Sequence, residues 1–144
     1  MIDKSALGAV GKAFDIDIDR GKIYEFARAV LSEDPAYIDD ERPVIPPTFL
    51  TTMFFWQNWE EGANPWDLVQ MSQERGMHAE QEFVFHGEPP RAGDRLVGQS
   101  RIAEIYEKQS RGGSTLTFVK MITEFRDKVD GRLVAEAILT GVER

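Results

Sequence analysis

The stretch that decides the fold is His78–Asp94, with the sequence HAEQEFVFHGEPPRAGD. Over residues 80–86 apolar and polar side chains alternate and place Phe83 and Phe85 on one face, as in a strand that buries one side. The following residues, GEPPRAGD, supply the Pro, Gly and Asp that turns require. The same stretch carries both histidines of the chain, His78 and His86, so it bears on chemistry as well as on fold.

Three further strands follow this one in the second half of the chain, predicted at residues 95–107, 115–126 and 132–143. Their connections, SRGGS and KVDGR, are rich in turn-forming residues, so we expect the four strands to run antiparallel as a meander. A short strand near residues 14–18 joins them in the same prediction. The apolar positions that support the three later strands are Leu96, Ile102, Tyr106, Val119, Met121, Phe125, Leu133, Ala135 and Leu139.

Two helices are predicted in the first half. Asp19 can cap a helix over residues 20–31, whose apolar residues Ile23, Phe26, Ala27, Val30 and Leu31 share one face. Pro35 ends it, and residues 32–46 are predicted as loop. A second helix, over residues 48–60, is apolar on most sides and therefore has to be enclosed. Together these elements predict an α+β fold in which an antiparallel sheet wraps around a central apolar helix.

Composition limits the possible functions. A chain of 144 residues is expected to form one domain, and the absence of Cys excludes disulfides, thiolate nucleophiles and Cys-type metal sites. The N-terminus has no signal pattern and no apolar run approaches the length of a membrane span, so we expect a cytoplasmic protein that does not enter a membrane. The net charge of −8 argues against a nucleic-acid partner.

Five segments, taken in order, resemble the N-terminal-type domain of MaoC-like dehydratases, which have the hot-dog fold. The match runs over nearly the whole chain. The five segments are GKIYEFARAV at 21–30, DPAY at 34–37, PPTF at 46–49, HAEQEF at 78–83 and RAGD at 91–94.

The resemblance implies acyl-thioester chemistry, the (R)-specific addition of water to an acyl chain, or its removal, on coenzyme A or acyl carrier protein. Catalytic relatives carry an Asp three residues before a Pro and a His two residues after it, which activate the water and transfer the proton. Counted from Pro35, these positions hold Ser32 and Tyr37 in this chain. Hydroxyl groups are poor bases at neutral pH, so the inherited pair cannot operate here.

This departure is typical of the N-terminal-type branch, in which such a domain supports a catalytic hot dog and shapes the acyl pocket. We therefore expect an accessory subunit of an (R)-specific enoyl-thioester hydratase or 3-hydroxyacyl-thioester dehydratase, with no catalytic residue of its own and no cofactor beyond the thioester substrate. Its partner is expected to be a catalytic hot-dog subunit in a heterodimer, or a second copy in a homodimer. Three alternatives stay open: a self-sufficient homodimeric hydratase, a hot-dog thioesterase, whose helix acids would be Glu60 and Glu61, and a module that binds acyl thioesters without turnover.

Several residues are candidates for the site. In a self-sufficient hydratase, His86 and Glu33 would be the first to test, although an edge histidine bound to backbone is the competing interpretation for His86. His78 is assigned a structural role near a dimer contact. The amides that open the helix at 48–60 could meet a thioester carbonyl, and Arg91 and Arg95 begin a basic stretch that continues to Arg111 and could meet an anion. The predicted ligand-binding residues are Tyr37, Pro47, Thr48, Phe49, Arg91 and Arg95.

Two further kinds of site are not expected. The two histidines have no spacing that would place two metal ligands on one helical face, so no metal site is predicted. Gly112 and Gly113 lie between two strands rather than between a strand and a helix, so a turn explains them better than a phosphate loop does. Trp56, Trp59 and Trp66 are predicted as core or interface residues.

Overall fold

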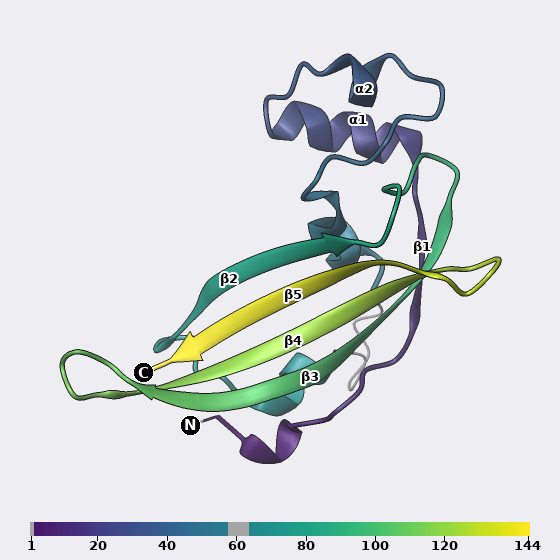
Figure 1. The fold of residues 1–144 in the computed structure, drawn as a ribbon. Helices are drawn as coiled ribbons and strands as arrows, with labels where there is room; N and C mark the ends of the chain where they lie inside the picture. Colours follow the sequence, from purple (N-terminus) through teal and green to yellow (C-terminus); the bar gives the residue numbers. More distant parts are fainter. Residues whose placement is uncertain (1, 58–63) are drawn as a thin grey trace.

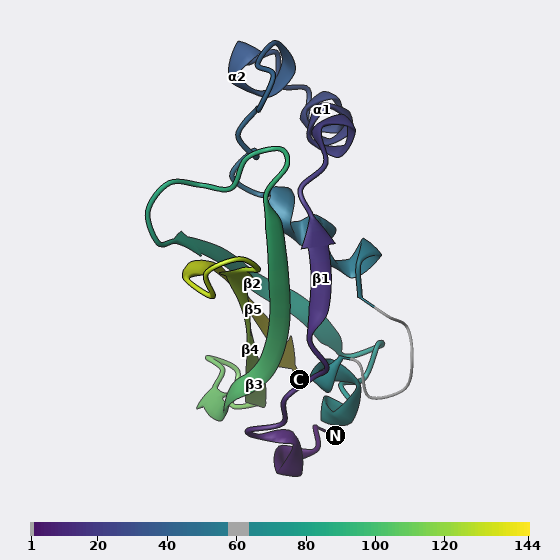
Figure 2. The ribbon, with the colours of Figure 1, turned by 90° about the vertical axis from the view of Figure 1, so that its right-hand side faces the viewer.

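The computed structural model describes residues 2–57 and 64–144. A five-stranded antiparallel sheet dominates it, in the order β1-β3-β4-β5-β2, and it is strongly curved (Figure 1, Figure 2). Short helical segments lie along one face of the sheet, and two helices stand beyond one end of it. The strands are β1 Phe14–Asp17, β2 Gly76–Phe85, β3 Arg95–Gln109, β4 Thr115–Asp127 and β5 Leu133–Glu143; the helical elements are η1 Lys4–Ala6, α1 Arg20–Ala29, α2 Pro35–Ile38, η2 Phe49–Phe55 and η3 Pro65–Val69.

The strand order confirms part of the predicted meander and corrects the rest. β3, β4 and β5 follow one another as antiparallel neighbours, but β2 pairs with β5 and not with β3. The prediction of a hairpin at residues 86–94 was therefore wrong. This segment instead crosses the end of the sheet, where Ile45 N donates to Pro90 O at 3.0 Å and Ala92 N donates to Pro43 O at 3.0 Å.

The sheet has an inner face, which packs on η2 and η3, and an outer face, which is turned toward the viewer in Figure 1. On β4 the fully buried residues Val119, Met121, Thr123 and Phe125 alternate along the strand and define the inner side. A bulge between Ile102 and Glu104 shifts the alternation on β3. Consequently Ile102 is buried on the inner face, whereas Tyr106 lies on the outer face.

Helix α1 begins where the sequence predicts. The Asp19 carboxylate accepts a hydrogen bond from Lys22 N at 2.9 Å, and Ile23 and Ala27 are fully buried. The helix ends at Ala29, however, and Leu31 adopts a left-handed conformation with φ of 59°. Val30 and Leu31, predicted on the buried face, are therefore 53% and 89% exposed, which corrects that prediction.

The central helix differs from its prediction in type and extent. Residues 49–55 form the 3-10 helix η2, and residues 58–60 of the predicted range, with Trp59, lie outside the described residues. Phe49, Leu50 and Met53 are at most 2% exposed, but Phe55 is 76% exposed with the Lys22 ammonium 5.5 Å from its ring centroid. The sheet therefore covers one side of this helix, and the prediction of a helix enclosed all round was wrong.

The main core lies between η2 and the inner face of the sheet. Phe26 of α1 meets Phe49 edge to face with ring centroids 5.6 Å apart, so α1 is fixed to the same core. A curved antiparallel sheet around a short buried helix is the hot-dog fold, and the predicted fold class is confirmed. In the part of the chain that the structure describes, no helix is both long and apolar enough to cross a membrane.

Candidate functional site

The α1–α2 loop and α2 hold the two positions at which the resemblance places an acid and an imidazole, Ser32 in the loop and Tyr37 in α2. Ser32 N donates to Ala27 O at 2.9 Å, which closes the end of α1 around the left-handed Leu31. The Ser32 hydroxyl accepts a long hydrogen bond from Asp34 N, at 3.4 Å. Its role in this loop is structural, and no carboxylate occupies its position.

The nearby acids do not replace the missing carboxylate. Asp34 caps α2, because its side chain accepts from Ala36 N at 2.9 Å, and Pro35 occupies the first turn, where no amide donor is needed. Glu33, the fallback base, lies exposed on the surface. Both groups belong to a solvated helix start, where nothing excludes water.

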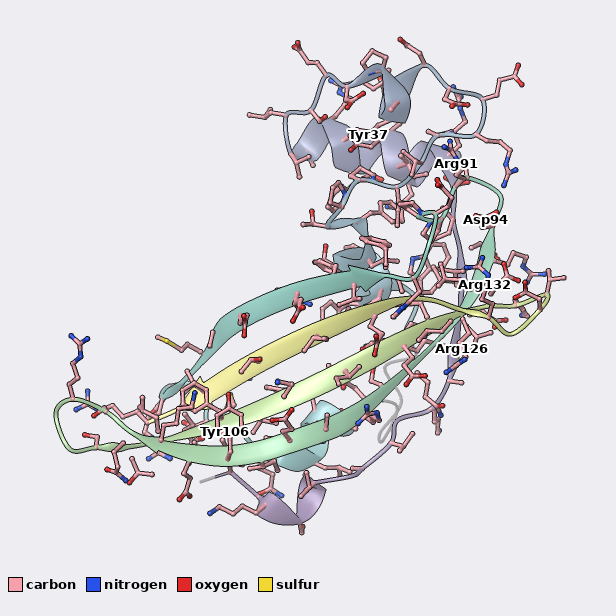
Figure 3. All side chains as sticks on the ribbon, viewed as in Figure 1. Tyr37, Arg91, Asp94, Tyr106, Arg126 and Arg132 are labelled. Carbon is pink, nitrogen blue, oxygen red and sulfur yellow. The ribbon has the colours of Figure 1, made fainter. Side chains whose placement is uncertain are left out.

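Tyr37 takes the position of the missing imidazole. Its half-buried ring packs against the edge of the main core and lines a small hollow of about 250 Å³ with Arg20, Gly21, Tyr24 and Ile38. Figure 3 shows it at the α1 and α2 end of the molecule. A phenol in this place can donate a hydrogen bond to a ligand or to a partner, but it is a poor base at neutral pH.

The two histidines lie at opposite ends of β2. His86 Nε2 is 2.8 Å from a Glu136 carboxylate oxygen, so an imidazole and a carboxylate do meet in this chain. The strand alternation that turns Phe83 and Phe85 inward turns His86 to the outer face, away from η2. His78 Nε2 instead contacts the carbonyl of Glu80 at 2.9 Å, across the bulge in β2.

The remaining predicted ligand residues are divided among several places. Phe49 is 1% exposed within the core, while Pro47 and Thr48 are exposed at the start of η2. Thr48 occupies the cap position but makes no side-chain capping bond. The structure does not bring these residues together with Tyr37 in one hollow, and their ligand role stays a prediction.

The predicted basic stretch from Arg91 to Arg111 is split between two ends of the sheet, because the long strand β3 separates its members. Arg91 belongs to a tight turn in which its amide donates to the Asp94 carboxylate at 2.8 Å, and Arg95 pairs with Asp17 at 2.9 Å. Arg91 lies at the α1 end of the sheet (Figure 3), and Arg95 begins β3 at the same end. Lys108 lies at the far end of β3, and Arg111 follows it in the β3–β4 hairpin. The glycines beside Arg111 form the β3–β4 hairpin as predicted, with Gly113 at φ of 80°.

A largely apolar hollow lies elsewhere, under the start of β2. It has a volume of about 460 Å³ and opens between η2, the segment from η3 to β2, and the inner face of β5. We call it the inner cavity. Its apolar lining residues are Phe54, Trp66, Met71, Met77, Met121 and Leu139.

Two glycines create the space for the walls of the inner cavity. A Cβ on Gly141 would lie 2.8 Å from the ring of Trp66, and one on Gly76 would lie 2.6 Å from the Met71 side chain. Trp66 was predicted as a core or interface residue, and the cavity beside it was not predicted from the sequence. An isolated glycine in a strand marks a close approach, so Gly141 was the available signal.

A buried carboxylate fixes the outer wall of this cavity. Glu143 is 7% exposed and accepts a hydrogen bond from Ser72 N at 2.7 Å, which lowers the pKa of the carboxyl group. Arg75 adds an ion pair at 3.4 Å. The segment from η3 to β2 is thereby tied to the end of β5. Among the described residues, no group of three or more metal-ligating side chains could hold a metal ion.

This geometry agrees with comparisons to known proteins. Residues 5–137 match the model of the FAS1-like dehydratase domain region. The chain therefore belongs to the FAS1-like dehydratase domain family. It is 30% identical over 136 residues to a UPF0336 protein of Streptomyces griseus, covering 89% of this chain and 85% of that one. A UPF0336 protein of Mycobacterium tuberculosis is 28% identical over 137 residues, with 85% and 74% covered.

Solved structures place this dehydratase-like domain among hot-dog assemblies. The truncated HadBC (3R-hydroxyacyl-ACP dehydratase) complex of Mycobacterium tuberculosis matches with a TM-score of 0.68 and 26% identity, over 92% of this chain and 95% of that chain. The ChsH1–ChsH2 complex from the same organism matches with a TM-score of 0.70 at 13% identity, over 97% and 85%. A MaoC-like dehydratase of Phytophthora capsici matches with a TM-score of 0.74 at 18% identity, over all of this chain and 50% of that one. The resemblance to MaoC-like dehydratases is thus confirmed.

Proposed function

We propose that this chain is the non-catalytic subunit of an (R)-specific enoyl-thioester hydratase or 3-hydroxyacyl-thioester dehydratase. The observation that carries the proposal is the loop at residues 32–37. Counted from Pro35, it presents the hydroxyls of Ser32 and Tyr37 where the resemblance requires a carboxylate and an imidazole. General acid and base groups therefore have to come from another chain.

The role left to this chain is to hold the acyl group. The inner cavity falls within the size range of small-molecule sites, and its walls are largely apolar, with methionines that can adapt to a flexible chain. It reaches His78 and Gln81 of β2, the edge strand that has no neighbour on its second side among the described elements. A partner hot dog that continues the sheet at this edge would lie beside the mouth of the cavity. A heterodimer is favoured, because two copies would bring no acid and imidazole pair to the loop.

The self-sufficient hydratase was predicted to depend on His86 or Glu33. Glu33 is exposed on the surface, and the structure pairs His86 with Glu136. Their 2.8 Å contact is a genuine imidazole and carboxylate pair, but it lies on the outer face and lines neither the inner cavity nor the hollow beside Tyr37. A proton donor has to reach its substrate within hydrogen-bonding distance. The acids of the thioesterase alternative, Glu60 and Glu61, lie outside the described residues.

The test is reconstitution of activity from two purified chains. The partner is a hot-dog protein that has Asp and His at the two positions, and the substrate is a trans-2-enoyl thioester. We expect the mixture to form the (R)-3-hydroxyacyl product faster than the partner alone, and the His86→Ala variant to support the same rate. If this variant abolished the stimulation while it stayed folded and bound the partner, the result would support the self-sufficient hydratase and contradict the proposal.

A further inference from the structure

The outer face carries an apolar row at the end of the sheet near the β3–β4 hairpin. Strand register aligns Tyr106 of β3 with Phe118 of β4, Phe118 with Val142 of β5, and Val142 with Met77 of β2. The rings of Tyr106 and Phe118 stack with centroids 5.1 Å apart and planes 7° apart. Figure 3 shows Tyr106 on this face, and no described helix covers it there.

A basic row runs directly beside the apolar one. Lys108 pairs in register with Leu116, and Arg144 N donates to Arg75 O at 3.3 Å, so the row is Lys108, Leu116, Arg144 and Arg75. The Lys108 ammonium lies 5.2 Å from the Tyr106 ring centroid and 5.4 Å from that of Phe118. The two rows enclose an open hollow of about 610 Å³, lined by Glu74, Arg75, Met77, Leu116, Phe118, Val142 and Arg144. We call this surface the outer basic patch.

The local charge opposes that of the whole chain. The chain carries a net charge of −8, yet few carboxylates offset the cations of this patch. Glu143 accepts from Ser72 N and also pairs with Arg75 at 3.4 Å, Glu107 pairs with Lys4 at 2.7 Å, and Glu74 lines the hollow. The cations that the patch offers to a partner are therefore Lys108 and Arg144. In the part of the chain that the structure describes, no ion pair joins Lys108 to an acid. An acidic partner would be repelled by most of this molecule and attracted here.

We propose that the outer basic patch docks an acidic carrier protein, the one that bears the acyl thioester. This inference rests on the proposed function and names the form in which the substrate arrives. The basic row supplies charge complementarity, and the apolar row supplies the desolvated contact that charge alone does not give. The patch is an open surface, whereas sites for small molecules bury most of the ligand.

The position of the patch suits delivery to the inner cavity. Met77 lines both the outer hollow and the inner cavity, so a single edge strand separates them. A carrier seated on the outer basic patch can pass its flexible tether around the Gly76 end of β2, beside Met77, which leaves the rest of this edge to the partner hot dog. A second copy of this chain is a poor occupant of the patch, because a two-fold contact there would oppose Arg75, Lys108 and Arg144 to the same residues.

The experiment measures binding of a holo acyl carrier protein to the purified chain by calorimetry at low and high salt. The variant Lys108→Glu/Arg144→Glu reverses two charges of the patch, and Arg101→Glu reverses an exposed arginine elsewhere on β3 as a matched control. We expect the double variant to weaken carrier binding by about ten-fold or more, a loss of about 1.4 kcal/mol. The control should change it by less than about three-fold, and salt should weaken the wild-type complex.

A parallel titration with a long-chain acyl-coenzyme A separates the two proposals. Retained acyl binding with lost carrier binding in the double variant supports docking at the patch. Equal carrier binding by wild type and double variant, absence of carrier binding by the wild type, or self-association that the double variant abolishes would each overturn it. Absence of acyl binding by the wild type would instead count against the proposed function.

Discussion

The two ends of the sheet have different properties. At the α1 end, the segment at residues 32–37 offers no acid and imidazole pair, since Ser32 and Tyr37 carry hydroxyls and Asp34 is occupied as a helix cap. At the β2 start, Gly76 and Gly141 keep a largely apolar cavity of about 460 Å³ open beneath Trp66 and Met71. Under the proposed function, the difference means that separate segments carry proton transfer and acyl binding, so a hot-dog domain can lose the first and keep the second.

The largest expected effect on the free energy of unfolding comes from truncating a core residue of η2. Phe49→Ala removes a side chain that is 1% exposed and packs on Phe26, so it leaves a cavity between η2, α1 and the sheet. We expect a loss of about 3–5 kcal/mol in the free energy of unfolding. Denaturant unfolding measures it, and the exposed Phe55→Ala is the matched control, expected within about 0.5 kcal/mol. Equal effects of the two variants would contradict the one-sided burial of η2.

Filling the inner cavity is expected to separate binding from folding. Gly141→Val places new atoms against the Trp66 ring, which a Cβ alone would meet at 2.8 Å. Overpacking of this kind costs about 1–3 kcal/mol, and we expect acyl-coenzyme A binding to be lost while the chain stays folded. Tryptophan fluorescence on titration with ligand measures the binding. Unchanged affinity in a folded variant would show that the acyl chain lies elsewhere.

The stability of the folded chain should depend on pH through Glu143, which ties the wall of the inner cavity to β5. Its pKa is lowered below the ordinary value of 4.5 chiefly by the Ser72 amide, so the ionised form stabilises the folded state. This stability is fully present above the unfolded pKa and is lost as the pH falls through the lower folded pKa. We expect Glu143→Gln to cost about 1–3 kcal/mol at pH 7, and the difference from wild type to shrink below pH of about 4.5. A difference that is constant down to pH of about 3 would contradict this assignment.

The smallest effect is expected at the loop itself. Ser32→Ala removes one long hydrogen bond, and Tyr37→Phe keeps the ring that packs on the core. Each is expected to change stability by less than about 1 kcal/mol, and neither should lower the hydration rate of the complex with a catalytic partner by more than about two-fold. Steady-state kinetics of the complex measures this. A loss of about 100-fold or more would show that one of these hydroxyls takes part in proton transfer, because positioned acid and base groups contribute at that scale.

The sequence predicted the fold through its longest periodic signals. Alternation along the strands and the cap at Asp19 were sufficient for the sheet and for the start of α1. The pairing of β2 with β5 was missed because a turn composition such as GEPPRAGD does not say whether a chain reverses or crosses an end of the sheet. The enclosure of η2 was overestimated because its apolar residues do not show which side the sheet covers.

The candidate site was predicted in part for a similar reason. The substitution of the acid and the imidazole can be read directly at Ser32 and Tyr37, because it depends on local spacing from Pro35. The inner cavity could not be read in that way, since it depends on Trp66 and Met71 meeting Gly141 and Gly76 across elements far apart in the chain. The outer basic patch likewise exists through strand register, which places Lys108 beside Arg144 and Arg75.

The most direct test of the division between binding and catalysis mixes the isolated chain, in excess, with a trans-2-enoyl-coenzyme A and follows binding and product in one sample. Tryptophan fluorescence reports occupancy of the inner cavity, and chromatography of the quenched sample reports 3-hydroxyacyl product. We predict a saturating fluorescence change with no product above the uncatalysed background. Formation of the hydrated thioester by this chain alone would contradict the assignment of proton transfer to a partner.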